Sequence, residues 1–96
     1  RQTVGIVSEM RVEDRLRRRL HQIAEQIGTA APEGVRIGLD LTHAQWASLI
    51  GASREAVTTA FGKLRAAGEV EMEGRSITIP WDAMNAADAP APALAS

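Results

Sequence analysis

Cysteine is absent from this 96-residue chain, and aromatic residues make up only 3% of it. The lack of cysteine excludes disulfide bonds, thiol catalysis, Cys-containing zinc sites and iron–sulfur ligation. The two histidines, His21 and His43, cannot build a convincing metal site alone. No apolar run is long enough to cross a membrane, so we expect no membrane partner. These absences argue against a secreted enzyme and against a metalloprotein.

The N-terminus has neither an initiator methionine nor the apolar core of a signal peptide. We therefore expect a piece of a longer cytoplasmic protein. The length suits one domain and is too short for two of ordinary size.

Charge is almost balanced, with 11 Lys or Arg against 12 Asp or Glu and a formal net charge of −1. A nucleic-acid binder is usually a basic domain, so the total alone argues against that class. The positions of the charges matter more, because five of the cations fall between Arg11 and Arg19. Local basic patches on a near-neutral chain predict weak non-specific binding to DNA rather than its absence.

An amphipathic helix is predicted over residues 12–27, where apolar residues recur every three or four positions, with Gly28 as its C-cap. Four arginines share one flank of this helix: Arg11, Arg15, Arg18 and Arg19. This flank is either a solvated face or a surface for DNA phosphates or a partner protein.

Two shorter helices are predicted in the middle of the chain. The first runs over residues 43–50, where Thr42 and Gln45 fit a capping box. The second runs over residues 54–67, with Ser53 as its N-cap. A glycine follows each helix: Gly51 and Gly68.

Alternating apolar residues indicate short strands on either side of these helices. Residues 35–41 alternate after a Gly- and Pro-containing loop at 28–34. Two more alternating runs, 70–72 and 77–79, flank Gly74 and predict a β-hairpin, which a following proline ends.

The spacing over residues 43–64 predicts a helix-turn-helix. Such a motif needs a glycine in its tight turn and a small residue where the two helices meet, as Gly51 and Ala47 provide. Apolar residues fill the remaining corner positions: Trp46, Ile50, Ala52, Val57, Ala60, Phe61 and Leu64. With the helix and strand before it and the hairpin after it, the motif predicts an α+β winged helix.

We therefore divide the chain into three parts. Residues 11–81 are predicted to form the winged helix domain. Residues 1–10 belong to something upstream, and residues 82–96, rich in Ala and Pro, form a disordered tail.

The run DLTHAQWASLIGASREAVTTAFGKLRAAGEVEMEGRSITI resembles the C-terminal DNA-binding domain of the Crp/Fnr family of bacterial transcription regulators. The resemblance covers residues 12–80 and implies that residues 1–10 end the dimerisation helix and form the hinge. It implies a homodimer that binds double-stranded DNA. No cofactor is expected in this chain, because the family's N-terminal sensor domain, which often binds a cyclic nucleotide, is not part of it.

The second helix, 54–67, is predicted to read bases in the major groove. Arginine can pair with guanine N7 and O6, and glutamate can accept from cytosine N4, which are the roles that the resemblance implies for Arg54 and Glu55. The alternative is an ion pair that merely decorates a helix start. Thr58 and Thr59 complete the predicted base contacts. Many family members carry a second arginine at the position of Thr59, which leaves the preferred half-site open.

Phosphate contacts are predicted for two hydroxyls and two cations: Thr42, Ser53, Lys63 and Arg75. Helix capping alone would also explain the two hydroxyls. Three glutamates, Glu69, Glu71 and Glu73, would repel phosphate and are expected to face away from DNA. Their face is either solvated or turned toward a partner such as RNA polymerase.

The sequence thus favours a sequence-specific DNA-binding domain of a dimeric transcription regulator. The alternative is a winged helix that docks a protein through its arginine flank or its glutamate strand. An enzyme is not expected, because no nucleophile is accompanied by a base and an orienting group.

Overall fold

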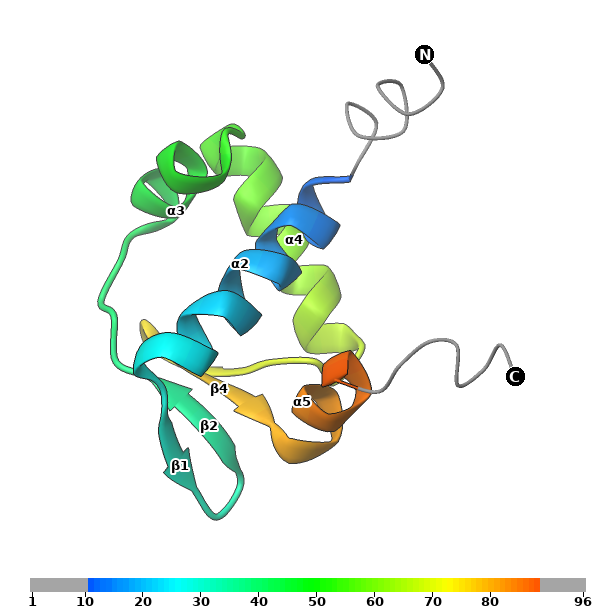
Figure 1. Ribbon diagram of the computed structural model, residues 1–96. Coiled ribbons are helices and arrows are strands. Elements are labelled where there is room, and N and C mark those ends of the chain that lie inside the picture. Colours follow the sequence, from blue (N-terminus) through cyan, green and yellow to red (C-terminus); the bar gives the residue numbers. More distant parts are fainter. Residues whose placement is uncertain (1–10, 89–96) are drawn as a thin grey trace.

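The computed structural model describes residues 11–88 and consists of a helical layer against a small antiparallel sheet (Figure 1). The helices are α2 (Val12–Ile27), α3 (His43–Ile50), α4 (Arg54–Ala66) and α5 (Trp81–Asp88). The strands are β1 (Thr29–Ala31), β2 (Gly34–Ile37), β3 (Glu71–Glu73) and β4 (Ser76–Pro80). This order confirms the predicted α+β winged helix-turn-helix. The expectations for residues 1–10 and 89–96 lie outside the described part.

Helix α2 follows the predicted stripe and buries Leu16, Leu20 and Ala24 completely or nearly so. It ends at Gly28, whose N–H donates to the Ala24 carbonyl. The cap is extended rather than left-handed, with φ −70° and ψ 157°, so the chain passes directly into the first strand. Neither α2 nor any other helix within residues 11–88 combines the length and the apolar character needed to cross a membrane.

The segment before the helix-turn-helix differs from the prediction. Part of the expected loop at 28–34 is strand β1, which pairs with β2 in an antiparallel hairpin. The strand predicted over 35–41 is shorter, since β2 ends at Ile37. Leu39 and Leu41 continue the apolar alternation but lie in the connection to α3, partly buried against the core. Alternation therefore marked buried positions without marking where strand pairing stops.

The helix-turn-helix forms at the predicted positions. Gly51 ends α3 in the left-handed region, with φ 74° and ψ 48°, a conformation that strains any residue with a side chain. The N–H groups of Gly51 and Ala52 both donate to the Ala47 carbonyl, at 2.8 and 2.9 Å, and close the turn. Helix α4 starts at Arg54, as predicted, and ends at Ala66, one residue earlier than predicted.

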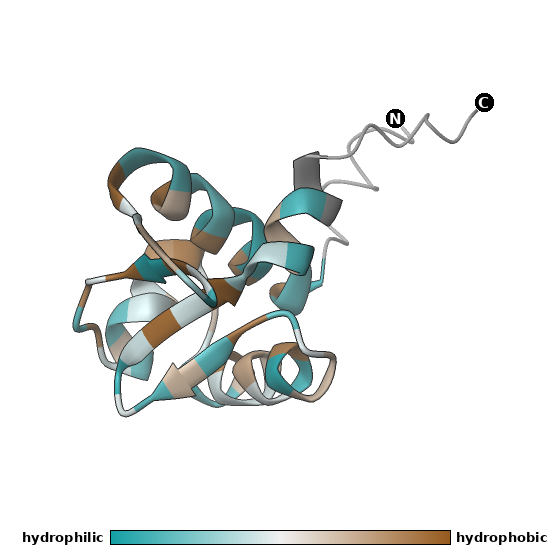
Figure 2. Cartoon of the chain, turned by 90° about the horizontal axis from the view of Figure 1, so that it is seen from below, coloured by the Kyte–Doolittle hydropathy of each residue, from teal (hydrophilic) through white to brown (hydrophobic). Residues whose placement is uncertain are grey.

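The wing is the hairpin of β3 and β4, and β4 also pairs with β2, so the strand order is β1-β2-β4-β3. Hydrophobic and hydrophilic residues are interspersed along the helices and strands, as Figure 2 shows from below. The helix-facing side of the sheet carries buried aliphatic side chains, contributed by Val35, Ile37, Ile77 and Ile79. The opposite side carries polar residues, so one layer of helices is enough to cover the sheet.

The predicted disordered tail is wrong over residues 82–88. Helix α5 begins at Trp81 directly after β4, and Met84 is 9% exposed within the core. The Trp81 indole N–H donates to the Ala31 carbonyl at 2.9 Å and ties the helix to β1. Alanine-rich composition was interpreted as disorder, but alanine also favours helix once one apolar residue is buried.

Two glycines in contrasting surroundings test this packing. A Cβ on Gly34 would lie 2.1 Å from the Ile79 carbonyl oxygen, whereas one on Gly62 would meet nothing within 4 Å. We expect Gly34→Ala to lower the free energy of unfolding by about 1–3 kcal/mol through overpacking. Gly62→Ala should raise it by about 0.5–1 kcal/mol through helix propensity. Urea denaturation measures both, and equal effects of the two variants would contradict the packing described.

Candidate nucleic-acid interface

The four predicted base contacts all lie exposed on the first half of α4. Arg54 and Glu55 occupy its first turn, with side chains 64% and 77% exposed, and form an ion pair of 3.5 Å. An exposed ion pair of this kind contributes little to stability. The pair can therefore break at small cost, and each side chain can then bind a ligand instead. Thr58 and Thr59 follow one turn later and point to different neighbours.

Thr58 is held from the side of α3. Its hydroxyl donates to the Arg54 carbonyl at 3.1 Å and lies 2.7 Å from His43 Nδ1. The hydroxyl thus takes part in two hydrogen bonds, and the imidazole tautomer decides which group donates in the contact with His43. The His43 ring also stacks on Phe61, with centroids 5.2 Å apart and an interplanar angle of 20°. Thr58 therefore has its methyl group, rather than its hydroxyl, available for a base.

Thr59 lies on the other side of α4 and faces the start of α2. A groove of about 360 Å³ runs between the two helices, and its lining includes Thr59, Arg11, Glu13 and Lys63. Lys63 Nζ lies 3.4 Å from the Glu13 carboxylate. The Lys63 side chain is 61% exposed and Glu13 only 19%, so the predicted phosphate role of Lys63 requires it to leave a largely buried carboxylate.

Thr42 and Ser53 cap the two helices of the motif. The Thr42 hydroxyl accepts from the Gln45 N–H at 3.1 Å, and the Gln45 side chain accepts from the Thr42 N–H at 2.8 Å, which confirms the capping box. The Ser53 hydroxyl accepts from the Ala56 N–H at 3.0 Å. A capping hydroxyl uses only a lone pair, so its proton remains available to a phosphate beside the helix N-terminus.

The tip of the wing lies next to the segment that leads into α3. Arg75 occupies the two-residue loop between β3 and β4, after Gly74, whose φ of 64° closes the turn. Its guanidinium lies 3.4 Å from Asp40, two residues before Thr42. The Arg75–Asp40 and His43–Thr58 contacts therefore connect the wing tip, the start of α3 and the first half of α4. We call this region the reading surface.

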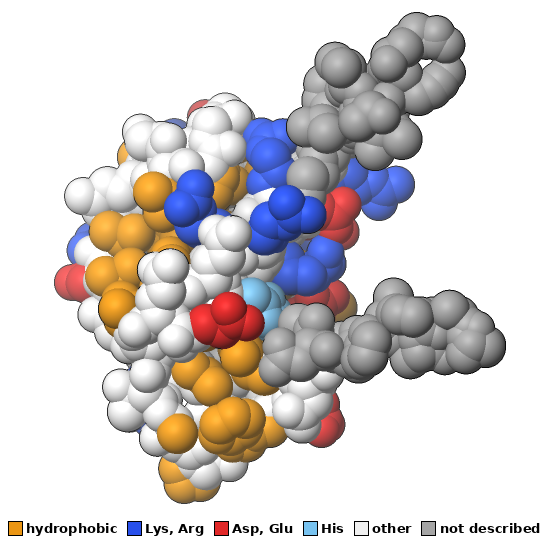
Figure 3. All heavy atoms as spheres, in the orientation of Figure 1, with side chains coloured by type: hydrophobic (Ala, Val, Ile, Leu, Met, Phe, Trp, Pro, Cys, Tyr) orange, Lys and Arg blue, Asp and Glu red, His pale blue; other side chains and the backbone are white. Residues whose placement is uncertain are grey.

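The arginine flank of α2 is divided among several tasks. Figure 3 shows the cationic side chains gathered over α2. Arg15 bonds to backbone carbonyls at the end of α3. Arg18 and Arg19 are exposed and line a groove of about 230 Å³ with Leu49, which is 41% exposed. The flank is therefore more than a solvated face, because one of its members connects two helices.

Arg17, on the other side of α2, binds Glu69 with two nitrogens, one of them at 3.2 Å, and also binds Asp14. The hydrogen bond with Glu69 raises the pKa of the Arg17 guanidinium above its ordinary value, while partial burial acts in the opposite direction. Glu69 was expected to share an exposed face with Glu71 and Glu73, but it lies before β3 and is half-buried in this pair.

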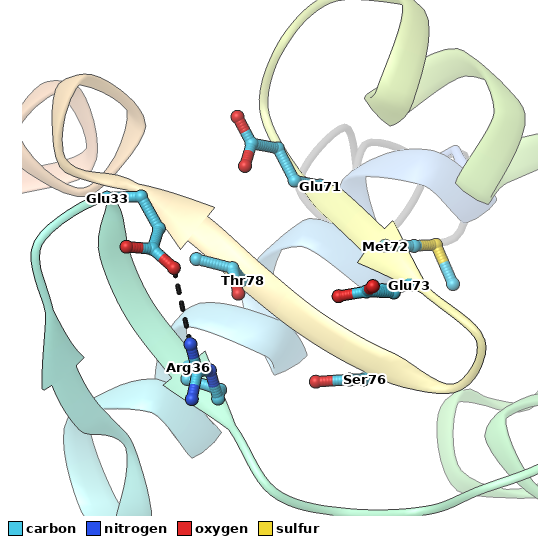
Figure 4. A pocket seen from close by; sticks show the side chains of 7 residues that line it. All are labelled: Glu33, Arg36, Glu71, Met72, Glu73, Ser76 and Thr78. Carbon is cyan, nitrogen blue, oxygen red and sulfur yellow. Dashed lines mark hydrogen bonds and ion pairs between the residues drawn. The ribbon is translucent and has the colours of Figure 1, made fainter.

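The outer face of the sheet is acidic. It carries a depression of about 590 Å³. Glu33 and Arg36 point toward each other in it (Figure 4), and their carboxylate and guanidinium lie 3.2 Å apart. Glu71 and Glu73 extend from β3 into the same region. Three carboxylates against one guanidinium would repel phosphate, which supports the expectation that this face turns away from DNA.

Two contributors to the interface were missed from the sequence. His43 was considered only as a metal or catalytic group, and Arg15 only as part of a charged flank. The last turn of α3 carries no basic residue to balance its carbonyl end, but the last turns of α2 and α5 carry none either, so this feature does not single out the end of α3. Nothing in the sequence says which distant arginine fills that place, because the contact spans 35 residues.

Comparisons with known proteins agree with this geometry. Residues 14–81 match the family of Crp-like helix-turn-helix domains. The chain is 37% identical over 68 residues to the CRP-like cAMP-activated global transcriptional regulator of Mycobacterium tuberculosis, covering 71% of this chain and 30% of that protein. It therefore spans less than a third of the length of this curated relative.

Solved structures show the same fold. A mutant of CooA from Carboxydothermus hydrogenoformans superposes with a TM-score of 0.73 at 19% identity, covering 90% of this chain and 40% of that one. The c-di-GMP responsive global regulator CLP of Xanthomonas campestris superposes with a TM-score of 0.65 at 25% identity, covering 82% and 38%.

The capping contacts predict a specific stability pattern. Thr42→Ala removes the hydroxyl that satisfies the Gln45 N–H and should lower the free energy of unfolding by about 1 kcal/mol. Thr42→Ser keeps the hydroxyl and should retain most of the stability. Ser48→Ala, on the exposed side of the same helix, should change it by less than about 0.5 kcal/mol. Chemical denaturation distinguishes the three, and a loss shared by Thr42→Ala and Ser48→Ala would contradict the capping role.

Proposed function

The chain belongs to the family of Crp-like helix-turn-helix domains, and we infer from this membership that it is the DNA-binding output domain of a transcription regulator. We propose that it reads sequence through the first half of α4, placed in the major groove. The observation that carries this proposal is the exposed Arg54–Glu55 pair at the start of α4, on the same surface as two capped helix N-termini and the wing tip.

Base recognition would begin with exchange of partners. Arg54 and Glu55 bind each other weakly in free solution, and their donor and acceptor sets match guanine and cytosine respectively. Thr59 is too short for a bidentate contact and would offer its methyl or hydroxyl to a thymine or a phosphate. Thr58, whose hydroxyl is engaged by the Arg54 carbonyl and His43, would contribute a methyl contact.

Phosphate binding would surround this helix. The hydroxyls of Thr42 and Ser53 and the amides of the first turns form two anion-binding helix ends. Lys63 and Arg75 would each exchange a carboxylate for a phosphate. Because both cations start from ion pairs, we expect modest non-specific affinity and a large share of the binding energy from specific contacts.

The parent protein would act as a homodimer in the cytoplasm, with two α4 helices entering successive major grooves about 34 Å apart. An effector would act outside residues 11–88. The relatives' names mention cAMP and c-di-GMP, so they do not single out one ligand. Contact with RNA polymerase would use a surface other than the reading surface, and the acidic sheet face is available for it.

Removing Arg54 tests the proposed function. The wild-type chain should enrich a short G-containing half-site from a pool of random duplexes, with affinity that falls steeply as salt rises. Arg54→Ala should lose discrimination at one base pair, by about 1–3 kcal/mol. Arg65→Ala, exposed in the last turn of the same helix, should keep the preference. Fluorescence anisotropy with labelled duplexes gives the affinities.

The competing function is protein docking by the winged helix. If neither the chain nor a version dimerised by a fused coiled coil enriches any duplex at low salt, the DNA-reading proposal fails. Docking through Arg18, Arg19 and Leu49 would then be the next function to test.

Thr59→Arg provides a gain-of-function test. Many family members carry arginine at this position, and Thr59 is exposed beside the groove shared with Arg11. We expect the variant to add a preference for guanine at a second position of the selected half-site, worth about 1–3 kcal/mol. Selection and sequencing with Thr59→Arg and with Thr59→Lys, which adds charge without a bidentate fork, would separate base reading from general attraction. Identical site preferences for both would contradict the predicted contact.

A further inference from the structure

Helix α3, which leads into the turn of the motif, has no cation of its own at its C-terminus. It is only eight residues long, His43–Ile50, and its last turn contains no basic residue. The final carbonyls of a helix lack partners within it and carry partial negative charge, which a nearby cation stabilises. Helix α4 supplies such cations itself, because Lys63 and Arg65 lie in its own last turn. A cation at the end of α3 would have to come from another element.

Arg15 of α2 provides that cation. Its Nε donates to the Ile50 carbonyl at 3.2 Å, and its terminal nitrogen donates to the Gly51 carbonyl at 3.0 Å. These two carbonyls belong to the last residue of α3 and to the left-handed residue of the turn. The planar fork of a guanidinium can reach two adjacent acceptors at once, which a single ammonium cannot do with the same geometry.

We propose that Arg15 is a positioning residue for DNA reading: it joins the turn of the helix-turn-helix to α2 and thereby sets the direction in which α4 leaves the turn. The proposal rests on the proposed function. Arg15 binds backbone rather than a side chain, so it acts on the path of residues 50–53 whatever side chains stand there. Ser53, the N-cap of α4, lies two residues after Gly51, which carries the second of the bonded carbonyls. A change at Arg15 therefore reaches Arg54 and Glu55 through the turn.

The neighbouring arginine supplies a matched control. Arg18 lies on the same flank of α2, is exposed and borders the same groove as Arg15. Removing either side chain subtracts one positive charge from the same region. Of these two arginines, Arg15 is the one that donates hydrogen bonds to carbonyls of the turn. A difference between Arg15→Ala and Arg18→Ala therefore reports the contacts that Arg15 makes rather than the net charge.

The first measurement needs no DNA. Amide hydrogen exchange should be followed by NMR at Gly51 and Ala52, whose N–H groups bond to the Ala47 carbonyl. We expect Arg15→Ala to speed exchange at these amides by about tenfold or more through local opening, with little change in the centre of α4. Arg18→Ala should leave all of them unchanged. Unchanged exchange in Arg15→Ala would overturn the proposal.

The second measurement uses the duplex selected by the wild-type chain and a scrambled duplex. Arg15→Ala should lower the ratio of the two affinities by about tenfold, because α4 is no longer held in one direction, while the salt dependence stays as in the wild type. A salt slope reduced by about one, with equal loss on both duplexes, would identify Arg15 as a phosphate contact and overturn the proposal.

Arg15→Lys keeps the positive charge and replaces Arg15→Ala in both measurements if Arg15→Ala does not fold. It should show intermediate exchange at Gly51 and Ala52 and an intermediate affinity ratio, since an ammonium near the helix end still favours the fold. Full wild-type behaviour of Arg15→Lys would overturn the role of the two-carbonyl contact. If the wild-type chain prefers no duplex, the proposed function fails and the DNA part of this inference fails with it, while the exchange result still decides whether Arg15 holds the turn.

Discussion

The contact between Trp46 and Phe61 is the physical constraint on which the helix-turn-helix depends. The two rings meet edge to face, with centroids 6.0 Å apart and planes at 74°, and both are almost completely buried. An edge-to-face pair stabilises one relative orientation of its rings, and here the rings belong to α3 and α4. His43 adds a stacked contact on Phe61 from the first turn of α3. This aromatic corner packs α3 against α4, and the contact of Arg15 with the turn acts on the same junction.

Charge is separated on this domain rather than accumulated. Carboxylates concentrate on the outer face of the sheet, around Glu71 and Glu73, while the reading surface holds helix ends and cations already paired with acids. Such an arrangement reconciles a net charge of −1 with DNA binding. Each ion pair that exchanges for a phosphate releases a carboxylate near the DNA, which opposes indiscriminate binding. Specific base contacts then have to supply much of the discrimination, which suits the proposed action as a homodimer.

Local signals in the sequence were sufficient for the helices of the motif and for the wing. The capping box of Thr42 and Gln45, the left-handed Gly51 and the hairpin glycine each express a local backbone rule, and the structure follows them. The base and phosphate contacts stay predictions that rest on the exposure and helix positions of these residues. What local rules missed depends on distant contacts. The extra strand β1 is stabilised by pairing with the edge of β2, and α5 is stabilised by the burial of Met84 in the core.

The distinction between local rules and distant contacts also applies to individual side chains. Three helical cations have different partners that their sequence surroundings do not reveal. Arg15 binds backbone carbonyls at the turn, Arg17 binds two carboxylates, and Lys63 binds one carboxylate. Their partners lie tens of residues away, or on a neighbouring turn in the case of Asp14, and no spacing rule selects among them. Composition also misled at the C-terminal end, where alanine suits either a helix or a disordered segment until an apolar anchor decides.

The most direct measurement of the central claim is amide chemical-shift mapping of the chain with the duplex that it selects. The account predicts that the largest shifts occur at residues 42–44, at 53–59 and at the wing tip, 74–76. It predicts little change on the outer face of the sheet, around Arg36 and Thr78. Shifts confined to that face, or to the groove lined by Arg18 and Leu49, would contradict the claim that α4 reads DNA from the surface described here.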